Sequence, residues 1–251
     1  MSRGLALAVA VGLGLLVFSG AAQAQPFVPG IEVNLVEGDD PEQVATGLQI
    51  LLLLTVLSLA PALLIMLTSF TRVVVVLAFT RNALATQHMP PNQVLVGLAL
   101  FLTLFIMAPV VETVRQEAWV PFQDGEVELE EAIDRAAGPL RSFMFEYTRE
   151  KDLALFMEIS GHERPATEDD VPTHVLIPAF AISELRTAFQ IGFVIFVPFI
   201  VIDMVVASTL MSMGMLMLPP MMISLPFKIL LFVLVDGWHL VVRSLISGFG
   251  V

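Results

Sequence analysis

The fold of this chain is decided by one long apolar run, AFQIGFVIFVPFIVIDMVVASTLMSMGMLML, at residues 188–218. These 31 residues contain a single charged side chain, that of Asp203. About 20 apolar residues suffice for a helix to cross a bilayer, so the run is longer than one span requires. Pro198 indicates a bend within the run, and Pro219-Pro220 indicates its end. The run therefore predicts a membrane helix with a bend.

Three further apolar runs accompany the first. They occupy residues 48–67, 94–111 and 221–242, and Pro61 and Pro109 kink or interrupt the first two. The whole chain is 57% hydrophobic and 14% charged, whereas soluble domains are about 45–50% apolar and about 25% charged. We therefore predict an all-α membrane protein built of helical hairpins, with kinked and broken helices rather than four straight spans.

The N-terminus has the pattern of a secretory signal peptide over residues 1–24. Arg3 precedes an apolar stretch, and Ala22-Gln23-Ala24 forms a small-x-small cleavage site. Cleavage there would leave residues 25–47 as a polar lead-in that starts outside the cytoplasm. The alternative is that the apolar stretch is retained as a first membrane helix.

Residues 112–178 differ in composition from the rest of the chain. They contain sixteen Asp or Glu and six Lys or Arg, a net charge of −10. We interpret them as a solvated helical insert between a first hydrophobic hairpin, residues 48–111, and a second, residues 179–251. With the mature N-terminus outside, Arg72 and Arg81 lie inside, as the positive-inside tendency expects, and the insert lies outside.

Five charged residues lie in or beside the apolar runs: Glu184, Arg186, Asp203, Lys228 and Asp236. Unpaired charges in hydrocarbon are costly, so such side chains usually pair between helices or face a water-filled conduit. Glu184 and Arg186 are two residues apart and would not face each other on a helix, so each needs a partner elsewhere. We expect Lys228 to pair with a carboxylate or with backbone carbonyls.

The sequence contains no constellation typical of an enzyme. The four histidines are isolated, and there is no H-E-x-x-H, G-x-S-x-G or glycine-rich phosphate loop. The chain has no cysteine for a thiolate site, and its net charge of −12 argues against nucleic-acid binding. A carboxylate dyad of Asp203 and Asp236 rests only on their number. We predict no catalytic residue, cofactor or metal, and keep a solute transporter or ion channel as an alternative.

Six of the thirteen methionines lie between residues 211 and 222. The first four alternate with other residues, which would place them on one side of an extended segment. Methionine is flexible and polarizable, so it repacks around irregular shapes. Because Gly214 and Pro219-Pro220 interrupt the cluster, we interpret it as a deformable constriction. A buried methionine-rich core is the alternative.

Four segments, taken together and in this order, are specific: MLTSFTRVVVVLAFTRNAL (66–84), PPNQVLVGLALFLTLFIMAP (90–109), PAFAISELRTAFQIGFVIFVPFIVIDMVVASTLMSMGMLMLPP (178–220) and SLPFKILLFVLVDGW (224–238). They closely resemble the FliP family of type III secretion export-gate subunits, and the resemblance covers nearly all of residues 48–246. The signal peptide points to its flagellar branch, and an injectisome subunit is the alternative.

The resemblance implies a function that composition does not reach. Family members assemble with other copies of themselves and with FliQ- and FliR-like subunits around a central pore, in the cell inner membrane and the flagellar basal body. Unfolded flagellar proteins pass through this pore, and the acidic insert would lie in the periplasm. Met213, Met215 and Met217 match the family's methionine gasket, although this chain has Met215-Leu216-Met217 where three consecutive methionines are common.

Overall fold

The structure is a computed structural model of the chain, and it describes residues 41–86, 89–162, 165–215 and 217–250. The predicted signal peptide, most of the polar lead-in and Leu216 lie outside these residues. The chain divides into two compact units, residues 1–52 and 53–251. All of the sites discussed below lie in the second unit.

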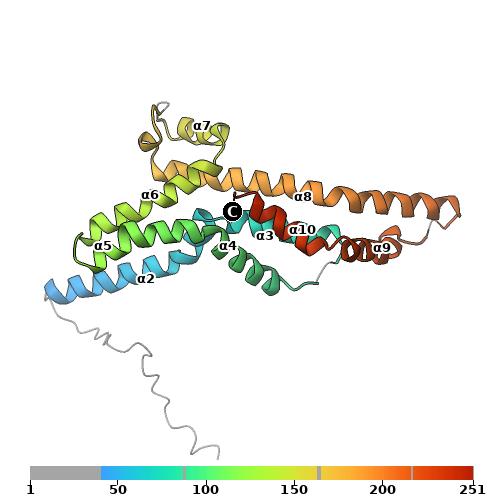
Figure 1. Ribbon diagram of the computed structural model, residues 1–251, viewed down its shortest axis with the longest axis horizontal. Coiled ribbons are helices and arrows are strands. Elements are labelled where there is room, and N and C mark those ends of the chain that lie inside the picture. The colour runs from blue at the N-terminus through green and yellow to red at the C-terminus, as the bar shows by residue number, and fades with distance from the viewer. Residues whose placement is uncertain (1–40, 87–88, 163–164, 216, 251) are drawn as a thin grey trace, which may run out of the picture. The chain divides into compact units, whose positions relative to one another are not determined.

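Every regular element in the described part of the chain is helical (Figure 1), which confirms the predicted all-α class. Helices satisfy their own backbone hydrogen bonds, which is what an apolar surrounding demands. The elements are α2 (Pro41–Leu67), α3 (Phe70–Ala83), α4 (Asn92–Val114), a π-helical turn (Arg115–Trp119), α5 (Val120–Gln123), α6 (Leu129–Tyr147), α7 (Glu150–Ile159), a 3-10 turn (Glu168–Asp170), α8 (Thr173–Ser212), α9 (Pro220–Leu234) and α10 (Gly237–Ser247).

Two helical stretches among the described residues are each long and apolar enough to cross a membrane alone. They are Asn92–Gln123 and Thr173–Ser212. Two bent pairs also qualify if each counts as one broken span. Helices α9 and α10 meet at 62°, and α2 bends by 46° between Leu59 and Pro61. The prediction of kinked and broken helices is therefore confirmed.

Pro109 and Pro198 interrupt the helices less than the sequence suggested. The apolar run that contains Pro109 continues as helix through the π-helical turn to Gln123. Helix α8 likewise runs for 40 residues through Pro178 and Pro198. Each proline removes one backbone hydrogen bond, and a π-helical turn or a packed neighbour can absorb the distortion without ending the helix.

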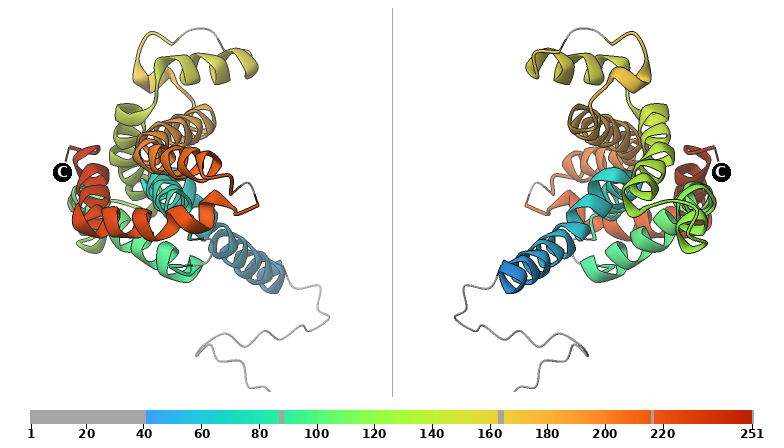
Figure 2. Two further views of the ribbon diagram at one scale, coloured as in Figure 1. Left: turned by 90° about the vertical axis from the view of Figure 1, so that its right-hand side faces the viewer. Right: turned by 90° about the vertical axis from the view of Figure 1, so that its left-hand side faces the viewer.

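Helix α3 lies alongside α8 in the core of the second unit (Figure 2). With 14 residues, α3 is too short to span a bilayer, and its VVVVLAF segment buries Val73, Val76 and Leu77 completely. Gly192 lets the two helices approach, because a methyl group there would lie 2.6 Å from Cγ of Phe79. The arginine-flanked segment is thus a core helix.

The acidic insert is helical, and continuous helices join it to the apolar segments. Its first residue, 112, lies within the helical stretch Asn92–Gln123, and its last residue, 178, lies within Thr173–Ser212. From α6, Phe143 and Met144 enter the core that α3, α4 and α8 form. The insert is therefore attached by both backbone and packing.

Candidate functional site

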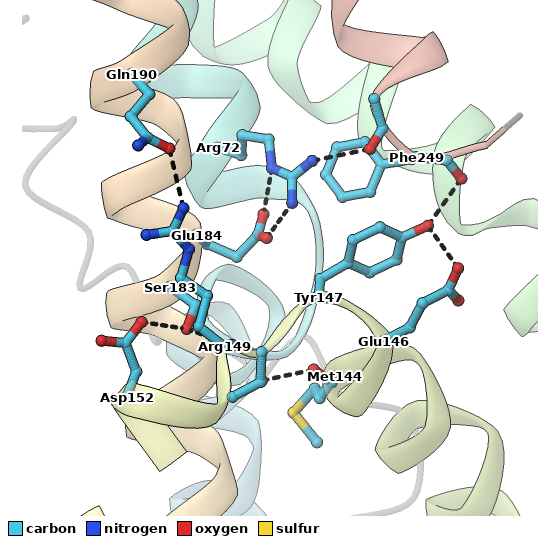
Figure 3. A network of polar contacts seen from close by, with 12 residues as sticks. Arg72, Met144, Glu146, Tyr147, Arg149, Asp152, Ser183, Glu184, Gln190 and Phe249 are labelled. Atoms are coloured by element: carbon cyan, nitrogen blue, oxygen red, sulfur yellow. Dashed lines mark hydrogen bonds and ion pairs between the residues drawn. The ribbon is translucent and has the colours of Figure 1, made fainter. Parts of the chain in front are cut away.

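A buried ion pair joins α3 to α8 (Figure 3). Arg72 donates from Nε to Oε2 of Glu184 at 2.9 Å and from Nη2 to Oε1. The two side chains are only 4% and 0% exposed. A two-pronged pair of this kind offsets much of the cost of burying both charges. Glu184 therefore finds its partner on another helix of the same chain.

Residues 248–250, which we call the C-terminal segment, cover this ion pair. Arg72 donates from Nη1 to the carbonyl of Gly248 at 3.2 Å, and its guanidinium lies 3.8 Å from the centre of the Phe249 ring. Tyr147 of α6 donates from its hydroxyl to the carbonyl of Phe249 at 2.9 Å. Carbonyl and aromatic contacts thus complete the shell around the cation.

Partial burial and the neighbouring Glu146 carboxylate raise the pKa of the Tyr147 phenol. The Glu146 oxygen also accepts a hydrogen bond from the phenol at 3.2 Å. Both effects favour the neutral phenol, which is the form that donates to the C-terminal segment.

A second set of hydrogen bonds ties the insert to α8, one residue before Glu184. Ser183 donates to Oδ2 of Asp152 at 2.7 Å and accepts from the backbone N–H of Arg149 at 3.1 Å (Figure 3). The Arg149 side chain donates to Gln190 at 3.2 Å. The insert, α3, α8 and the C-terminal segment therefore meet in one polar cluster, which we call the Arg72 cluster.

A second ion pair includes the buried Lys228, which pairs as the sequence predicted. Its Nζ lies 2.6 Å from Oδ2 of Asp203 on α8 and 3.4 Å from the carbonyl of Ala83. Ser224 donates to the other Asp203 oxygen at 2.5 Å. Lys228 is 2% exposed and Asp203 is 34% exposed. We call these residues the Lys228 clamp, because they fasten α9 to α8.

Arg186 and Asp236 occupy different surroundings. Both side chains are exposed, and no ion pair within the described ranges includes either of them. Asp236 marks the α9–α10 bend with a left-handed backbone, φ 51°. Since Asp203 is bound by Lys228 and Ser224, the contacts of the described residues lend no support to a carboxylate dyad. Among the same residues, no group of three or more His, Cys, Asp or Glu could hold a metal ion.

The methionine cluster begins in a helix and continues into a turn. Helix α8 runs to Ser212, so Met211 and the helix-capping Met213 are not part of an extended segment, and that expectation is wrong for them. Gly214, at φ 75°, ends the helix: its N–H donates to the Met211 carbonyl, and the Met215 N–H donates to the Leu210 carbonyl. These two hydrogen bonds, together with a glycine in the left-handed conformation, form the Schellman motif.

The side chains of the turn are exposed within the single chain. Met213 is 68% exposed and Met217 is 94% exposed, while Met215 is half-buried. The buried-core alternative therefore fails for Met213 and Met217 within one chain. We call residues 213–219 the methionine turn.

Sequence reasoning missed several of these residues. For Arg72, the sequence predicts only the side of the membrane on which it lies. It identifies none of Tyr147, Phe249 and Ser224 as a candidate site residue. Ser224 had a usable signal, because it stands one helical turn before Lys228 on the same face. The contacts of Arg72 carried no such local signal.

Comparison with known proteins identifies relatives along most of the chain. The model of the FliP family matches residues 53–245. The flagellar biosynthetic protein FliP of Bacillus subtilis (strain 168) is 59% identical over 217 residues, which are 86% of this chain and 98% of that protein. The protein of the same name from Pectobacterium carotovorum subsp. carotovorum is 50% identical over 239 residues, which are 95% and 92% of the two chains. That of Caulobacter vibrioides is 48% identical over 250 residues, which are 99% and 92%.

Proposed function

This chain belongs to the FliP family, whose members are components of the flagellar type III export apparatus, and we propose that it is a channel-forming subunit of the export gate. In this proposal it assembles with other copies of itself and with FliQ- and FliR-like subunits in the cell inner membrane. Unfolded flagellar proteins cross through the channel. The family is not enzymatic, so the chain acts through its structure rather than through catalysis.

One observation carries the proposal: an exposed methionine turn joins two helices that the Lys228 clamp holds together. The Lys228 clamp joins α8 to α9 below the methionine turn, and Met213 and Met217 beyond it are largely exposed. Flexible thioether side chains can close around chains of varied shape and re-form contacts afterwards. In a ring of copies, the methionine turns of several subunits would form a soft gasket from Met213, Met215 and Met217.

The exposed apolar faces support a role in an assembly. Only 11% of the most apolar window of α8 is buried within the chain. Phe189, Phe193 and Val201 on α8, and Phe227 and Val233 on α9, are more than half exposed. Lipid and neighbouring subunits would share these faces. In such an assembly the exposed Arg186 and Asp236 would find partners on neighbouring subunits or line the conduit.

Replacement of the turn methionines tests the gasket. With Met213, Met215 and Met217 all changed to alanine, the complex should assemble in normal yield on a native gel but leak ions when no substrate is present. The matched control changes Met66 and Met204, which are exposed but lie outside the methionine cluster, to alanine and should not leak. Normal yield without a leak in the first variant would contradict the gasket, and purified chain that moves a small solute by itself would favour the transporter alternative.

Orientation is tested separately. Because the chain has no cysteine, a single Asp169→Cys substitution in the exposed loop before α8 gives one labelling site. A membrane-impermeant maleimide added from the periplasmic side should react with it. Reaction only from the cytoplasmic side would reverse the proposed topology.

N-terminal sequencing should find a mature protein that starts at Gln25, and an intact Met1 would refute cleavage.

A further inference from the structure

An apolar groove of about 550 Å³ lies between the α3–α4 connection and the α9–α10 bend. Only two of its lining side chains, those of Thr86 and Trp238, contain nitrogen or oxygen. The Thr86 hydroxyl donates to the carbonyl of Arg81 at 3.2 Å, so it is satisfied within the chain. The remaining side chains of the lining are apolar: they include the thioether of Met89 and the hydrocarbon side chains of Pro91, Val94, Leu98, Ile229, Phe232 and Val233.

A cation stands beside this groove without a counter-ion. Arg81 donates from Nη1 to the carbonyl of Pro90 at 3.3 Å and to Oδ1 of Asn92 at 2.5 Å. Its buried Nε has no partner, and no ion pair among the described residues includes Arg81. Pro90 also lines the groove. Within the part of the chain that the structure describes, the guanidinium is therefore bound only by neutral oxygens, at the edge of an apolar groove.

The start of α4 adds to the same positive field. Pro91 precedes the helix, no side chain caps it, and its first turn contains no acidic residue. The free N–H groups and the dipole of a helix N-terminus favour an anion. Arg81 and the α4 N-terminus thus converge on one point beside the groove.

We propose that this groove binds one acyl chain of an anionic phospholipid, whose phosphate lies against Arg81 and the N-terminus of α4. The volume falls within the range of about 300–1,000 Å³ that small-ligand sites occupy. Helices α4 and α9 both belong to candidate membrane spans, so lipid chains can reach the groove from the side. Basic pockets between membrane helices recognise anionic head groups in this way.

Trp238 lines the groove, so its fluorescence can report the site. The chain has two tryptophans, and a Trp119→Phe background leaves Trp238 alone. The full-length chain, purified with its co-purifying partners, is placed in phosphatidylcholine nanodiscs that contain a low mole fraction of brominated lipid. Brominated phosphatidylglycerol should quench Trp238 with an apparent affinity about fivefold above that of brominated phosphatidylcholine.

Three variants separate the site from ordinary lipid contact. Arg81→Gln removes the charge, and Gln93→Glu puts a carboxylate in the first turn of α4, which suits the helix but repels a phosphate. Both should reduce the preference to about parity. Arg243→Gln, which changes an exposed arginine outside the groove, should retain it. If Arg81→Gln does not fold, Gln93→Glu decides alone.

Several outcomes would overturn the proposal. Equal quenching by the two lipids would remove the head-group site. No quenching would mean that a second copy or a partner subunit covers the groove. A preference that survives Gln93→Glu, or one that inorganic phosphate abolishes, would assign the selectivity to another surface or to a soluble anion.

Discussion

Helix α8 contributes Glu184 to the Arg72 cluster and leads into the methionine turn, and these two regions differ in almost every physical respect. In the cluster, both carboxylate oxygens of Glu184 on α8 accept hydrogen bonds from Arg72, and these two side chains are only 0% and 4% exposed. The turn follows the end of α8, where Met217 is 94% exposed. Removal of a partner in the Arg72 cluster should therefore destabilise the protein, whereas the methionine turn makes few contacts that a substitution could remove. The proposed gasket would require both, a stable cluster that holds the subunit together and a turn that is free to change shape.

The largest effect is expected from breaking the buried ion pair. Glu184→Ala leaves the Arg72 guanidinium buried without its carboxylate, which should cost about 3–5 kcal/mol and abolish assembly. The double variant Arg72→Met with Glu184→Leu removes both charges and should recover much of the loss. Thermal unfolding in detergent and complex yield measure both. A single variant as stable as the parent would remove the distinction between the two regions.

A somewhat smaller effect is expected where α3 and α8 approach most closely. Gly192→Val forces new atoms against Phe79 and should cost about 1–3 kcal/mol. The matched control is Gly97→Ala on α4, where a methyl group meets nothing within 4 Å. Because alanine favours a helix by about 1 kcal/mol over glycine, the control should be neutral or stabilising. Equal melting temperatures for the two variants would contradict this packing.

Loss of the Lys228 clamp should lower stability by an amount between those expected for the Arg72 cluster and for the methionine turn. Lys228→Met leaves Asp203 still bound by Ser224 and one-third exposed, so the loss should be about 1–2 kcal/mol. Complex yield and secretion of flagellar subunits should both fall. Normal yield with normal secretion would mean that the clamp does not hold together the two helices that the turn joins.

Alkaline pH should weaken closure of the C-terminal segment. The raised pKa of Tyr147 means that folding favours the neutral phenol. This contribution is fully present below the unfolded value of about 10 and is lost as pH rises through the folded pKa. Since Tyr147 is the only tyrosine, tyrosinate absorbance reports it directly. Phe249→Ala should lower the pKa, and Tyr147→Phe should cost about 1 kcal/mol and remove the signal. An unchanged titration in Phe249→Ala would separate Tyr147 from the C-terminal segment.

The smallest effect on stability is expected in the turn itself. Met217→Ala removes a side chain that is almost fully exposed, so unfolding should change by less than about 0.5 kcal/mol. A leak without loss of stability would sharpen the comparison. A large loss of stability would show that the turn is part of a core formed between subunits.

The class of protein and its helical elements could be predicted from local patterns along the chain. Apolar runs and their prolines predicted membrane helices with bends, because hydropathy and backbone hydrogen bonding act locally along the chain. The same local reasoning predicted the helix of the insert and the need of Lys228 for a partner. The family resemblance also came from local segments.

Which distant groups meet depends on how the helices pack. Arg72 and Glu184 are 112 positions apart, and no local pattern links them to each other or to Phe249. Packing also decided that α8 continues through Pro198 and that α3 is a core helix, because a neighbouring helix can stabilise what proline or short length would otherwise prevent. The end of α8 at Gly214 depends on a backbone geometry that residue types permit without specifying it. Contacts between distant residues depend on how helices pack, and a pattern that is read along one dimension does not contain that information.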